Sequence, residues 1–338
     1  MDLNTVWFLL FGVLLAGYAV LDGFDLGVGM LSLFGRSDDE RRLHLNAIGP
    51  VWDGNEVWLL TAGGALFAAF PAVYATAFSA FYLAFMLLLL FLIARAVAFE
   101  FRSKVASPAW RRFWDLAFGL GSLVPSLLYG VAVGNVLRGL PLREDGYSSV
   151  AFFELLNPQA LLVGFVTLSM FLAHGAAYLA MKTEGSLQAR CRRFALGGWA
   201  AWTALWAGAT ATFLSGSPHL FIGLLANPVF WVLAVPVLCG LAAFPILVRK
   251  GRDGLAFLAS SVAMVGQLGL AATSLYPRLI PDLANPDRGL TIHNAASSPL
   301  TLTVMLWIAG LGMPVVIGYT IYIHRVFRGK VRITPDSY

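Results

Sequence analysis

The chain has 338 residues, of which 59% are apolar and only 12% are charged, and its mean hydropathy is +0.76. Soluble domains carry about 25% charged residues, so this composition excludes a soluble globular protein and indicates an integral membrane protein. A net charge of +5 raises nucleic-acid binding as an alternative, but the basic residues follow a topological pattern, described below, that explains them without it.

Long apolar runs predict membrane-spanning helices. A helix needs about 20 apolar residues to cross the hydrocarbon core, whereas a membrane barrel would show alternating segments of about 10 residues. We therefore predict an all-α protein whose nine spans form one membrane domain over residues 1–338. The predicted spans cover residues 5–33, 50–70, 75–99, 114–137, 158–181, 194–214, 228–248, 254–276 and 301–323.

The distribution of Lys and Arg predicts how these spans are oriented. Of the 23 Lys and Arg residues, 19 fall in every second connection between spans. These basic segments are residues 34–49, 95–112, 182–193, 249–253 and the tail 324–338. Cytoplasmic loops are enriched in positive charge, so the N-terminus is expected outside and the C-terminus in the cytoplasm, which agrees with an odd number of spans.

The first predicted span contains two aspartates, Asp22 and Asp25, within the run Leu-Asp-Gly-Phe-Asp-Leu-Gly-Val-Gly at 21–29. A charged side chain at the centre of a membrane helix costs roughly 2.5–3.5 kcal/mol on insertion scales, so such residues usually face a protein interior, a partner or a water path. The two aspartates are three residues apart and share one helix face, in the cytoplasmic third of the span. Functional residues are therefore expected here.

The second and third predicted spans bring further charges to the same depth. The run Pro-Val-Trp-Asp-Gly-Asn-Glu-Val-Trp at 50–58 places Asp53 and Glu56 in the first turns of span two, where the helix N-terminus favours negative charge. Span three ends on the same side with Arg95 and Glu100. We expect these four side chains to converge with the two aspartates of span one.

The residues alone leave three interpretations of this acidic cluster open. The carboxyl groups could pass protons from the cytoplasm through water into the membrane interior. They could instead be structural, with Asp53 as a helix cap, Glu100 paired with Arg95 or Arg102, and the aspartates of span one bound to a neighbouring chain's arginine. Binding of an ion or a substrate is the third interpretation.

The histidines and cysteines do not suggest a cofactor site within this chain. Of five histidines only His174 lies well inside a predicted span, and a b-type haem between two spans generally needs two axial ligands at matching depth. We therefore expect no haem and no metal here, and a His174 that is hydrogen-bonded between helices. Cys191 falls in a loop and Cys239 in a span, so no disulfide is predicted.

Five runs of the sequence carry a resemblance to a known family. They are Leu21–Gly29, Pro50–Trp58, Ala62–Ala69, Arg95–Arg102 and Met181–Gly185. In this order they resemble subunit II of the cytochrome bd-type quinol oxidases, a family that includes the cyanide-insensitive oxidases. The resemblance implies a multi-pass subunit of a terminal oxidase in the bacterial inner membrane, which oxidises quinol and reduces oxygen to water. It also implies two four-helix bundles plus one peripheral helix.

The resemblance further implies the partners and cofactors. Subunit I of the family binds haem b and haem d, carries the quinol-oxidising loop and forms a heterodimer with subunit II. Small accessory single-span subunits and a structural quinone within subunit II are expected in some members. Protons are expected to pass along Asp25, Asp53 and Glu100, supported by Asp22, Glu56 and Arg95, and Trp58 is associated with oxygen access from the lipid face.

A stand-alone proton-coupled membrane transporter is the alternative from another functional class. It predicts a stable single chain without haem. The oxidase interpretation instead predicts co-purification with a second chain of similar size and a visible absorption spectrum. A third alternative is a passive assembly subunit whose acidic residues form only ion pairs.

Overall fold

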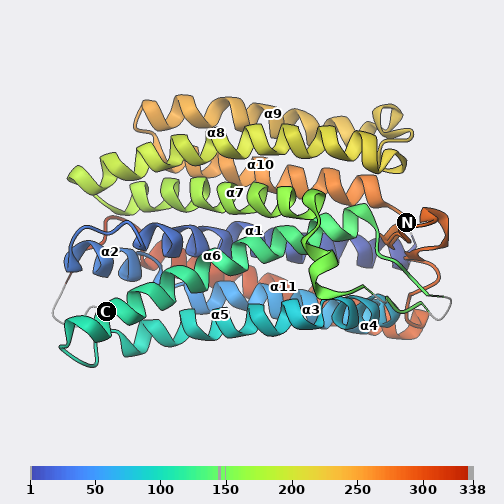
Figure 1. Ribbon diagram of the computed structural model, residues 1–338, viewed down its shortest axis with the longest axis horizontal. Helices are drawn as coiled ribbons and strands as arrows, with labels where there is room; N and C mark the ends of the chain where they lie inside the picture. Colours follow the sequence, from blue (N-terminus) through green and yellow to red (C-terminus); the bar gives the residue numbers. More distant parts are fainter. Residues whose placement is uncertain (1, 144–145, 149, 334–338) are drawn as a thin grey trace.

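The computed structural model describes residues 2–143, 146–148 and 150–333, which are almost entirely helical (Figure 1). The α-helices are α1 (Leu3–Ser32), α2 (Asp38–Ile48), α3 (Trp52–Ala69), α4 (Pro71–Ala80), α5 (Tyr82–Phe101), α6 (Pro108–Arg138), α7 (Pro158–Lys182), α8 (Gly185–Gly216), α9 (Pro228–Arg249), α10 (Asp253–Leu275) and α11 (Pro299–Val326). Short 3-10 helices lie at η1 (Phe152–Leu156), η2 (Pro218–Leu220), η3 (Leu224–Ala226) and η4 (Pro286–Arg288). Strands β1 (Arg278–Ile280) and β2 (Leu290–Thr291) pair antiparallel.

The helices confirm an all-helical, multi-pass membrane protein. Among the described residues, seven helices are long and apolar enough to cross a membrane, namely α1, α5, α6, α7, α9, α10 and α11. Helix α8 passes the same criterion only together with residues 218–226, from which it is bent by 109°. Helix α3, in the second predicted span, is not among them, and its first turns carry Asp53, Asn55 and Glu56.

The structure corrects two predicted segments. The predicted third span, 75–99, begins inside α4 and continues in α5, because the backbone leaves helical geometry at Phe81 (φ −96°, ψ 16°). The predicted loop 34–49 contains helix α2, which is capped by Ser37 accepting a hydrogen bond from the Glu40 backbone nitrogen at 3.2 Å. The residues of α2 are mostly polar, so the helix leaves no apolar run in the sequence from which it could be predicted.

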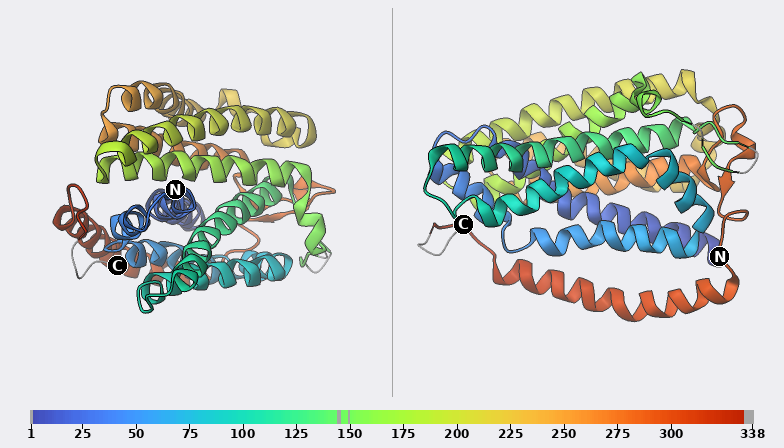
Figure 2. Two further views of the ribbon diagram at one scale, coloured as in Figure 1. Left: turned by 60° about the vertical axis from the view of Figure 1, so that its left-hand side comes forward. Right: turned by 60° about the horizontal axis from the view of Figure 1, so that its bottom comes forward.

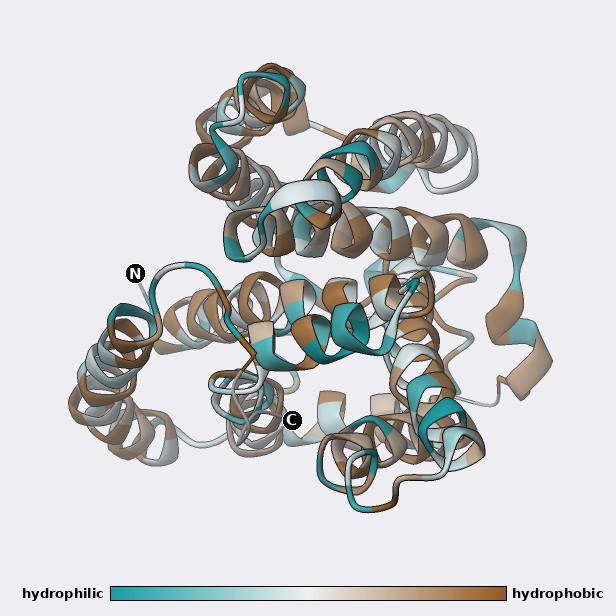
Figure 3. Cartoon of the chain, turned by 90° about the vertical axis from the view of Figure 1, so that its left-hand side faces the viewer, coloured by the Kyte–Doolittle hydropathy of each residue, from teal (hydrophilic) through white to brown (hydrophobic). Residues whose placement is uncertain are grey.

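Helix α1 lies at the centre of the molecule and packs against α3, α6, α7 and α10. Helices α3, α5 and α6 lie on one side of it, and α7 to α10 form the layer on the other side (Figure 1). Figure 3 views the molecule from the left-hand side of Figure 1 and shows hydrophilic stretches, in teal, among the segments nearest the viewer. Helix α11 is peripheral, packs mainly against α1 and α3, and buries only 6% of its most apolar window (Figure 2).

The two ends of the molecule differ in charge. The end with the connections after α1, α5, α7 and α9, and with residues 327–333, carries most of the Lys and Arg residues and is called the basic end below (Figure 1, left). At the opposite end two distant segments pair: the Leu140 backbone nitrogen donates to the Pro281 oxygen at 3.0 Å, and the Leu283 nitrogen donates to the Leu140 oxygen at 2.9 Å.

Helix α2 ties the basic end together through ion pairs. Asp38 accepts from Arg102, at the end of α5, at 2.6 Å, and Arg102 also donates to Asp115 of α6 at 2.6 Å. On its other side, Glu40 accepts from Arg190 of α8 at 2.5 Å. Because Arg102 is only 2% exposed, its two carboxylate partners are needed to compensate its charge.

Helices α1 and α7 meet backbone to backbone at two glycines. A Cβ built on Gly27 would lie 2.1 Å from the carbonyl oxygen of Phe171, and one on Gly175 would lie 2.5 Å from the Cα of Gly27. Neither position has room for a side chain. Small residues at such contacts let membrane helices approach closely, and here they bring α7 against the part of α1 that carries the aspartates.

We expect Gly27→Ala to lower the thermal stability of the purified complex, because the added methyl group would force α1 and α7 apart. Overpacking of this kind costs about 1–3 kcal/mol, and a backbone contact relaxes less readily than a side chain. Gly12→Ala is the matched control on the same helix, since a Cβ there meets nothing within 4 Å. Equal melting temperatures for the two variants would contradict the packing argument.

His44 gives α2 a pH-dependent contribution to stability. The residue is 2% exposed, and burial lowers the pKa of His44 from 6.5 to about 4. Between these two values the unfolded chain binds a proton that the folded chain does not. The stability contributed by the neutral imidazole is therefore complete above about pH 6.5, and it falls by about 1.4 kcal/mol per pH unit as the pH drops towards 4.

His44→Gln is accordingly expected to flatten the decrease in melting temperature between about pH 6.5 and 4.5, measured on the detergent-solubilised complex. His293→Gln changes an exposed histidine and serves as the control. If both variants lose stability with the same slope as the unaltered chain, burial of His44 does not govern the acid sensitivity of this end.

Candidate functional site

Arg95 lies in a buried charged cluster between α1, α3 and α5. Its side chain is fully buried although it belongs to a membrane-spanning helix. Its Nη2 donates to Asp22 Oδ1 at 2.7 Å and its Nη1 donates to Asp22 Oδ2 at 3.2 Å. Asp22 is also fully buried. This two-point contact lets a carboxylate and a guanidinium compensate each other where water is excluded.

Glu56 is the second carboxyl group on Arg95. Its Oε1 lies 3.3 Å from Arg95 Nη1, and its side chain is 25% exposed. Glu56 therefore connects the fully buried ion pair to the surface of the chain.

Two tyrosine hydroxyls adjoin the same aspartate. Tyr18, one turn earlier on α1, donates to Asp22 Oδ2 at 2.7 Å. The hydroxyl oxygen of Tyr129 on α6 lies 2.6 Å from that of Tyr18, and the two rings meet edge to face with centroids 5.4 Å apart. The hydrogen-bonded cluster thus joins α1, α3, α5 and α6.

Asp25 lies three residues further along α1 and is fully buried, with a separate partner. Its Oδ2 accepts from Asn55 Nδ2 on α3 at 2.7 Å, and the same amide donates to the Leu21 carbonyl oxygen at 3.3 Å. Asp25 Oδ1 has no hydrogen-bond partner among the described residues. A buried oxygen left in this way is a place where a proton or a water molecule binds favourably.

Local packing sets the spacing of α3, α5 and α6 around this cluster. Trp52 of α3 stacks on Phe99 of α5, with ring centroids 4.8 Å apart and planes inclined by 5°. Gly121 of α6 leaves room for Arg95, since a Cβ at Gly121 would lie 2.8 Å from the Arg95 Cβ. The aromatic stack and the glycine together explain why Arg95 reaches acidic residues from two other helices.

The other two predicted path residues lie outside this cluster. Asp53 and Glu100 are both exposed, near the basic ends of α3 and α5. Within the described part of the chain, neither forms a hydrogen bond or ion pair to Arg95. The predicted convergence therefore holds for Asp22, Glu56 and Arg95, whereas these two acids belong to the outer face of the same helices.

Trp58 lies against α1 at a glycine. A Cβ on Gly17 would lie 2.3 Å from the Trp58 ring, so the missing side chain makes room for the indole. Trp58 Nε1 is buried without a hydrogen-bond partner among the residues described. The role of Trp58 in oxygen access stays a prediction.

His174 is hydrogen-bonded between helices, as predicted. Its Nδ1 lies 2.7 Å from Ser260 Oγ on α10, its Nε2 lies 3.0 Å from the Val20 carbonyl oxygen, and its ring stacks on Phe257. Because both ring nitrogens are engaged, His174 does not fit the role of a haem ligand. Across the described residues, no group of three or more His, Cys, Asp or Glu side chains is arranged to hold a metal ion.

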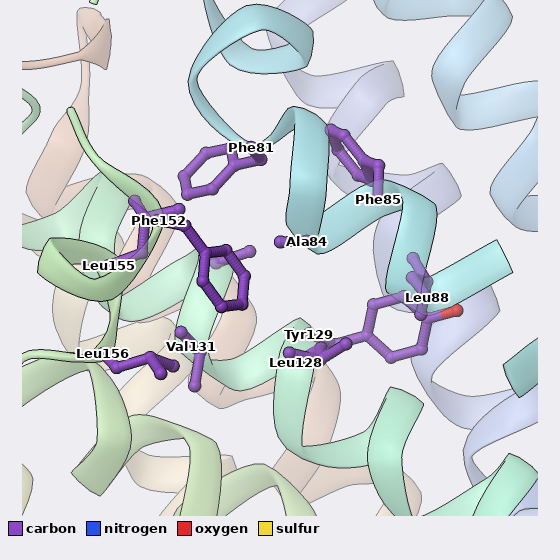
Figure 4. Close-up of a pocket in the computed structure, with 11 residues that line it drawn as sticks. Phe81, Ala84, Phe85, Leu88, Leu128, Tyr129, Val131, Phe152, Leu155 and Leu156 are labelled. Carbon is purple, nitrogen blue, oxygen red and sulfur yellow. The ribbon is translucent and has the colours of Figure 1, made fainter. Parts of the chain in front are cut away.

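A small apolar cavity lies next to the cluster, between α5, α6 and η1 (Figure 4). It has room of about 30 Å³, is lined by side chains such as Phe85, Phe152 and Leu155, and is bounded by the ring of Tyr129. In Figure 4 the Tyr129 hydroxyl points away from Phe152 and out of the cavity. The Tyr129 hydroxyl is therefore not placed to donate a hydrogen bond to a quinone carbonyl inside this cavity.

Three further members of the site, Tyr18, Asn55 and Tyr129, were not predicted from the sequence. Tyr18 precedes Asp22 by one helical turn, and Asn55 lies between two acidic residues of α3, so helical spacing could have indicated both. Tyr129 is 111 residues from its partner Tyr18, and only the packing of α6 on α1 brings them together.

Arg95→Leu is expected to lower the stability of the complex by about 3–5 kcal/mol, because Asp22 would remain buried without a counter-charge. The double variant Asp22→Asn/Arg95→Leu removes both charges and should recover much of that loss. Thermal unfolding of the purified complex measures both effects. Arg288→Leu, at an exposed arginine, is the control. If the double variant is no more stable than Arg95→Leu, the two charges do not compensate each other.

Comparisons with known proteins agree on one family. The family described as "Cytochrome bd terminal oxidase subunit II" matches residues 3–327. "Cytochrome bd-I ubiquinol oxidase subunit 2" of Escherichia coli (strain K12) is 40% identical, over 97% of this chain and 95% of its own length. "Cytochrome bd ubiquinol oxidase subunit 2" of Bacillus subtilis (strain 168) is 36% identical, over 98% and 97%.

A solved structure shows the same fold. A chain of the bd oxidase from Geobacillus thermodenitrificans superposes with a TM-score of 0.80 at 18% identity, covering 97% of this chain and 99% of that one. The chain therefore belongs to the cytochrome bd terminal oxidase subunit II family and is a membrane subunit of an oxidoreductase complex.

Proposed function

We propose that this chain carries protons from the cytoplasm towards the haem site of a partner subunit, where oxygen is reduced to water with electrons from quinol. The observation that carries the proposal is the buried cluster in which Arg95 contacts two carboxyl groups, Asp22 and Glu56, with Asp25 one turn away.

Charge balance supports this role. Asp22, Asp25 and Glu56 bring three carboxyl groups into a region where Arg95 is the cation that the described side chains supply. An uncompensated charge in a low-dielectric interior is costly, so such a cluster approaches neutrality by binding protons. Carboxyl groups that hold exchangeable protons inside a membrane are what a proton path requires.

The exposed acids supply the start of the proposed path. Asp53 lies one turn before Glu56 on α3, and Glu100 lies beyond Arg95 on α5, so both extend the cluster towards the basic end. The helix faces that carry these two acids also expose large apolar side chains, among them Leu60 of α3 and Ile93 of α5. We propose that the partner subunit covers this surface. Protons would then pass Glu100 and Asp53 at the interface between the two subunits and reach the buried Asp25.

The finer topology is part of the proposal. Counting α3 as the second span and α8 as the sixth gives nine spans, in two groups of four with α11 peripheral, and the basic end faces the cytoplasm of a bacterial inner membrane. Haem b and haem d are assigned to the partner, which the engaged nitrogens of His174 support. Quinol is the expected substrate, following relatives named as ubiquinol oxidase subunits. A structural quinone and accessory single-span subunits stay predictions.

A passive assembly role is the second candidate. The closed two-point contact of Asp22 on Arg95 favours it, because ion pairs of this geometry also occur as purely structural features. A structural ion pair does not explain why Asp25 Oδ1 lacks a hydrogen-bond partner among the described residues. This favours proton transfer through Asp25. A stand-alone proton-coupled transporter has no comparable observation in its favour, since the family is one of oxidase subunits.

Amide substitutions in the complete oxidase test the path. Asp25→Asn, Asp53→Asn and Glu100→Gln should each lower quinol-driven oxygen consumption, by about tenfold or more, because loss of a positioned proton carrier typically costs at least that much. The haem absorption spectrum of the purified complex should remain unchanged.

Asp39→Asn is the matched control, since Asp39 is an exposed acid on α2 at the same end of the molecule. Turnover that stays at the control level in all three variants would contradict the proposed proton path. Parallel loss of haem and turnover would instead support the assembly role.

A further inference from the structure

The tyrosine pair next to Asp22 has a defined hydrogen-bond direction. Tyr18 has a single hydroxyl proton, and the Asp22 carboxylate, 2.7 Å away, can only accept. The hydroxyl of Tyr129, 2.6 Å from Tyr18, must therefore donate to the Tyr18 oxygen. The pair forms a short chain that points from α6 towards the carboxylate.

Among the residues that the structure describes, this series of hydrogen bonds ends at Tyr129. The ring of Tyr129 forms part of the wall of the apolar cavity between α5, α6 and η1, and its hydroxyl turns away from that cavity (Figure 4). Because the Tyr129 hydroxyl points out of the cavity, the described residues do not continue the hydroxyl pair through the cavity towards the opposite end of the molecule. Its effect is directed at Asp22.

The two aspartates of α1 differ in how completely they are bonded. Asp22 accepts three hydrogen bonds, two from Arg95 and one from Tyr18, which occupy both of its oxygens. Asp25 accepts one, from Asn55, and keeps Oδ1 free among the described side chains. A carboxylate with both oxygens occupied is fixed in place, whereas one with a free oxygen has a position for a mobile proton.

The groups around Asp22 are known from each helix that packs there. Helix α5 supplies Arg95, α3 supplies Glu56 and α6 supplies Tyr129, while on α1 itself Tyr18 and Asp25 lie one turn away on either side. From α7, the nearby titratable groups are His174 and Tyr178. His174 Nε2 lies 3.0 Å from the Val20 carbonyl oxygen and its Nδ1 lies 2.7 Å from Ser260 Oγ of α10, while the ring of Tyr178 stacks on Phe24 of α1.

From this geometry we infer that Tyr18 and Tyr129 are positioning residues of the proton cluster. Their hydroxyl pair fixes the Asp22 carboxylate against Arg95, and this leaves Asp25 and Glu56 as the carboxyl groups that exchange protons. The inference deepens the proposed function and rests on it.

Phenylalanine variants of the complete oxidase test the inference. Tyr18→Phe removes one donor from Asp22, so the cluster should hold its protons more tightly and the pH profile of oxygen consumption should move upward by about one pH unit. Turnover at pH 7 should fall by roughly tenfold or more, the size expected for loss of one hydrogen bond to a charged group. Tyr129→Phe should give a smaller shift in the same direction.

The double variant separates positioning from independent effects. Because Tyr129 acts through Tyr18, Tyr18→Phe/Tyr129→Phe should behave as Tyr18→Phe alone. Tyr178→Phe is the control: Tyr178 is also buried in a helix next to α1, but its hydroxyl donates to the Ala47 carbonyl oxygen at 3.2 Å. The control should lose some stability at most and keep its pH profile.

A spectroscopic readout does not depend on turnover. The infrared carboxylate band that disappears in Asp22→Asn should shift in Tyr18→Phe and stay in place in Tyr178→Phe. A band and a pH profile that are the same in Tyr18→Phe as in the control would overturn the inference, and so would independent, additive effects of the two tyrosines.

Asp25→Asn and Glu56→Gln, measured alongside, distinguish failure of the inference from failure of the proposed function. If both acid variants keep full turnover, the proton path fails, and the inference fails with it. If the acid variants lose turnover while the tyrosine variants keep the pH profile and the infrared band of the control, only the inference fails.

Discussion

The ion pair between Asp22 and Arg95 constrains how the surrounding helices pack. Both side chains are fully buried, and two charges without water stabilise a fold only when their partners are held in good geometry. Helices α1 and α5 must therefore keep one relative depth and rotation. The surrounding contacts serve this requirement: Trp52 stacks on Phe99 between α3 and α5, and Gly121 lets α6 approach Arg95.

The same constraint explains why α1 is central. A helix with two buried aspartates cannot face lipid over that stretch, because charged groups need protein or water there. It is enclosed by α3, α6, α7 and α10, and the backbone contact at Gly27 brings α7 closer than side chains would allow. The aspartates of α1 must be surrounded by protein, and the glycines of α1 allow the neighbouring helices to come close enough to surround them.

Much of the fold could be predicted from the sequence because membrane helices leave a strong apolar signal. The long helices α1, α6, α7, α10 and α11 fall within or around predicted spans. Helix α2 could not be found in that way, because its stability comes from capping and ion pairs rather than from apolar residues. The break at Phe81 also lacked a signal, since the flanking residues are apolar on both sides.

The charged members of the site could be predicted, whereas their neutral partners could not. Asp22 and Arg95 stood out because charge is rare in a span, and Glu56 followed from helical spacing. No signal in the sequence pointed to Tyr129, because tyrosines are common among the many aromatic residues of a membrane protein. The outward position of Asp53 and Glu100 could not be predicted either, since the sequence gives their depth along a helix but not which face of the helix turns outward.

The ion pairs of α2 have a consequence for handling the protein at different ionic strengths. Asp38 and Arg111 are about 40% exposed (43% and 38%), so dissolved ions can reach them, whereas Arg102 is 2% exposed. The Debye length shrinks from about 10 Å at 0.1 M to about 3 Å at 1 M, which weakens exposed pairs far more than enclosed ones. Concentrated salt therefore weakens the exposed ion pair between Asp38 and Arg111, whereas the buried pair between Asp22 and Arg95 is little affected.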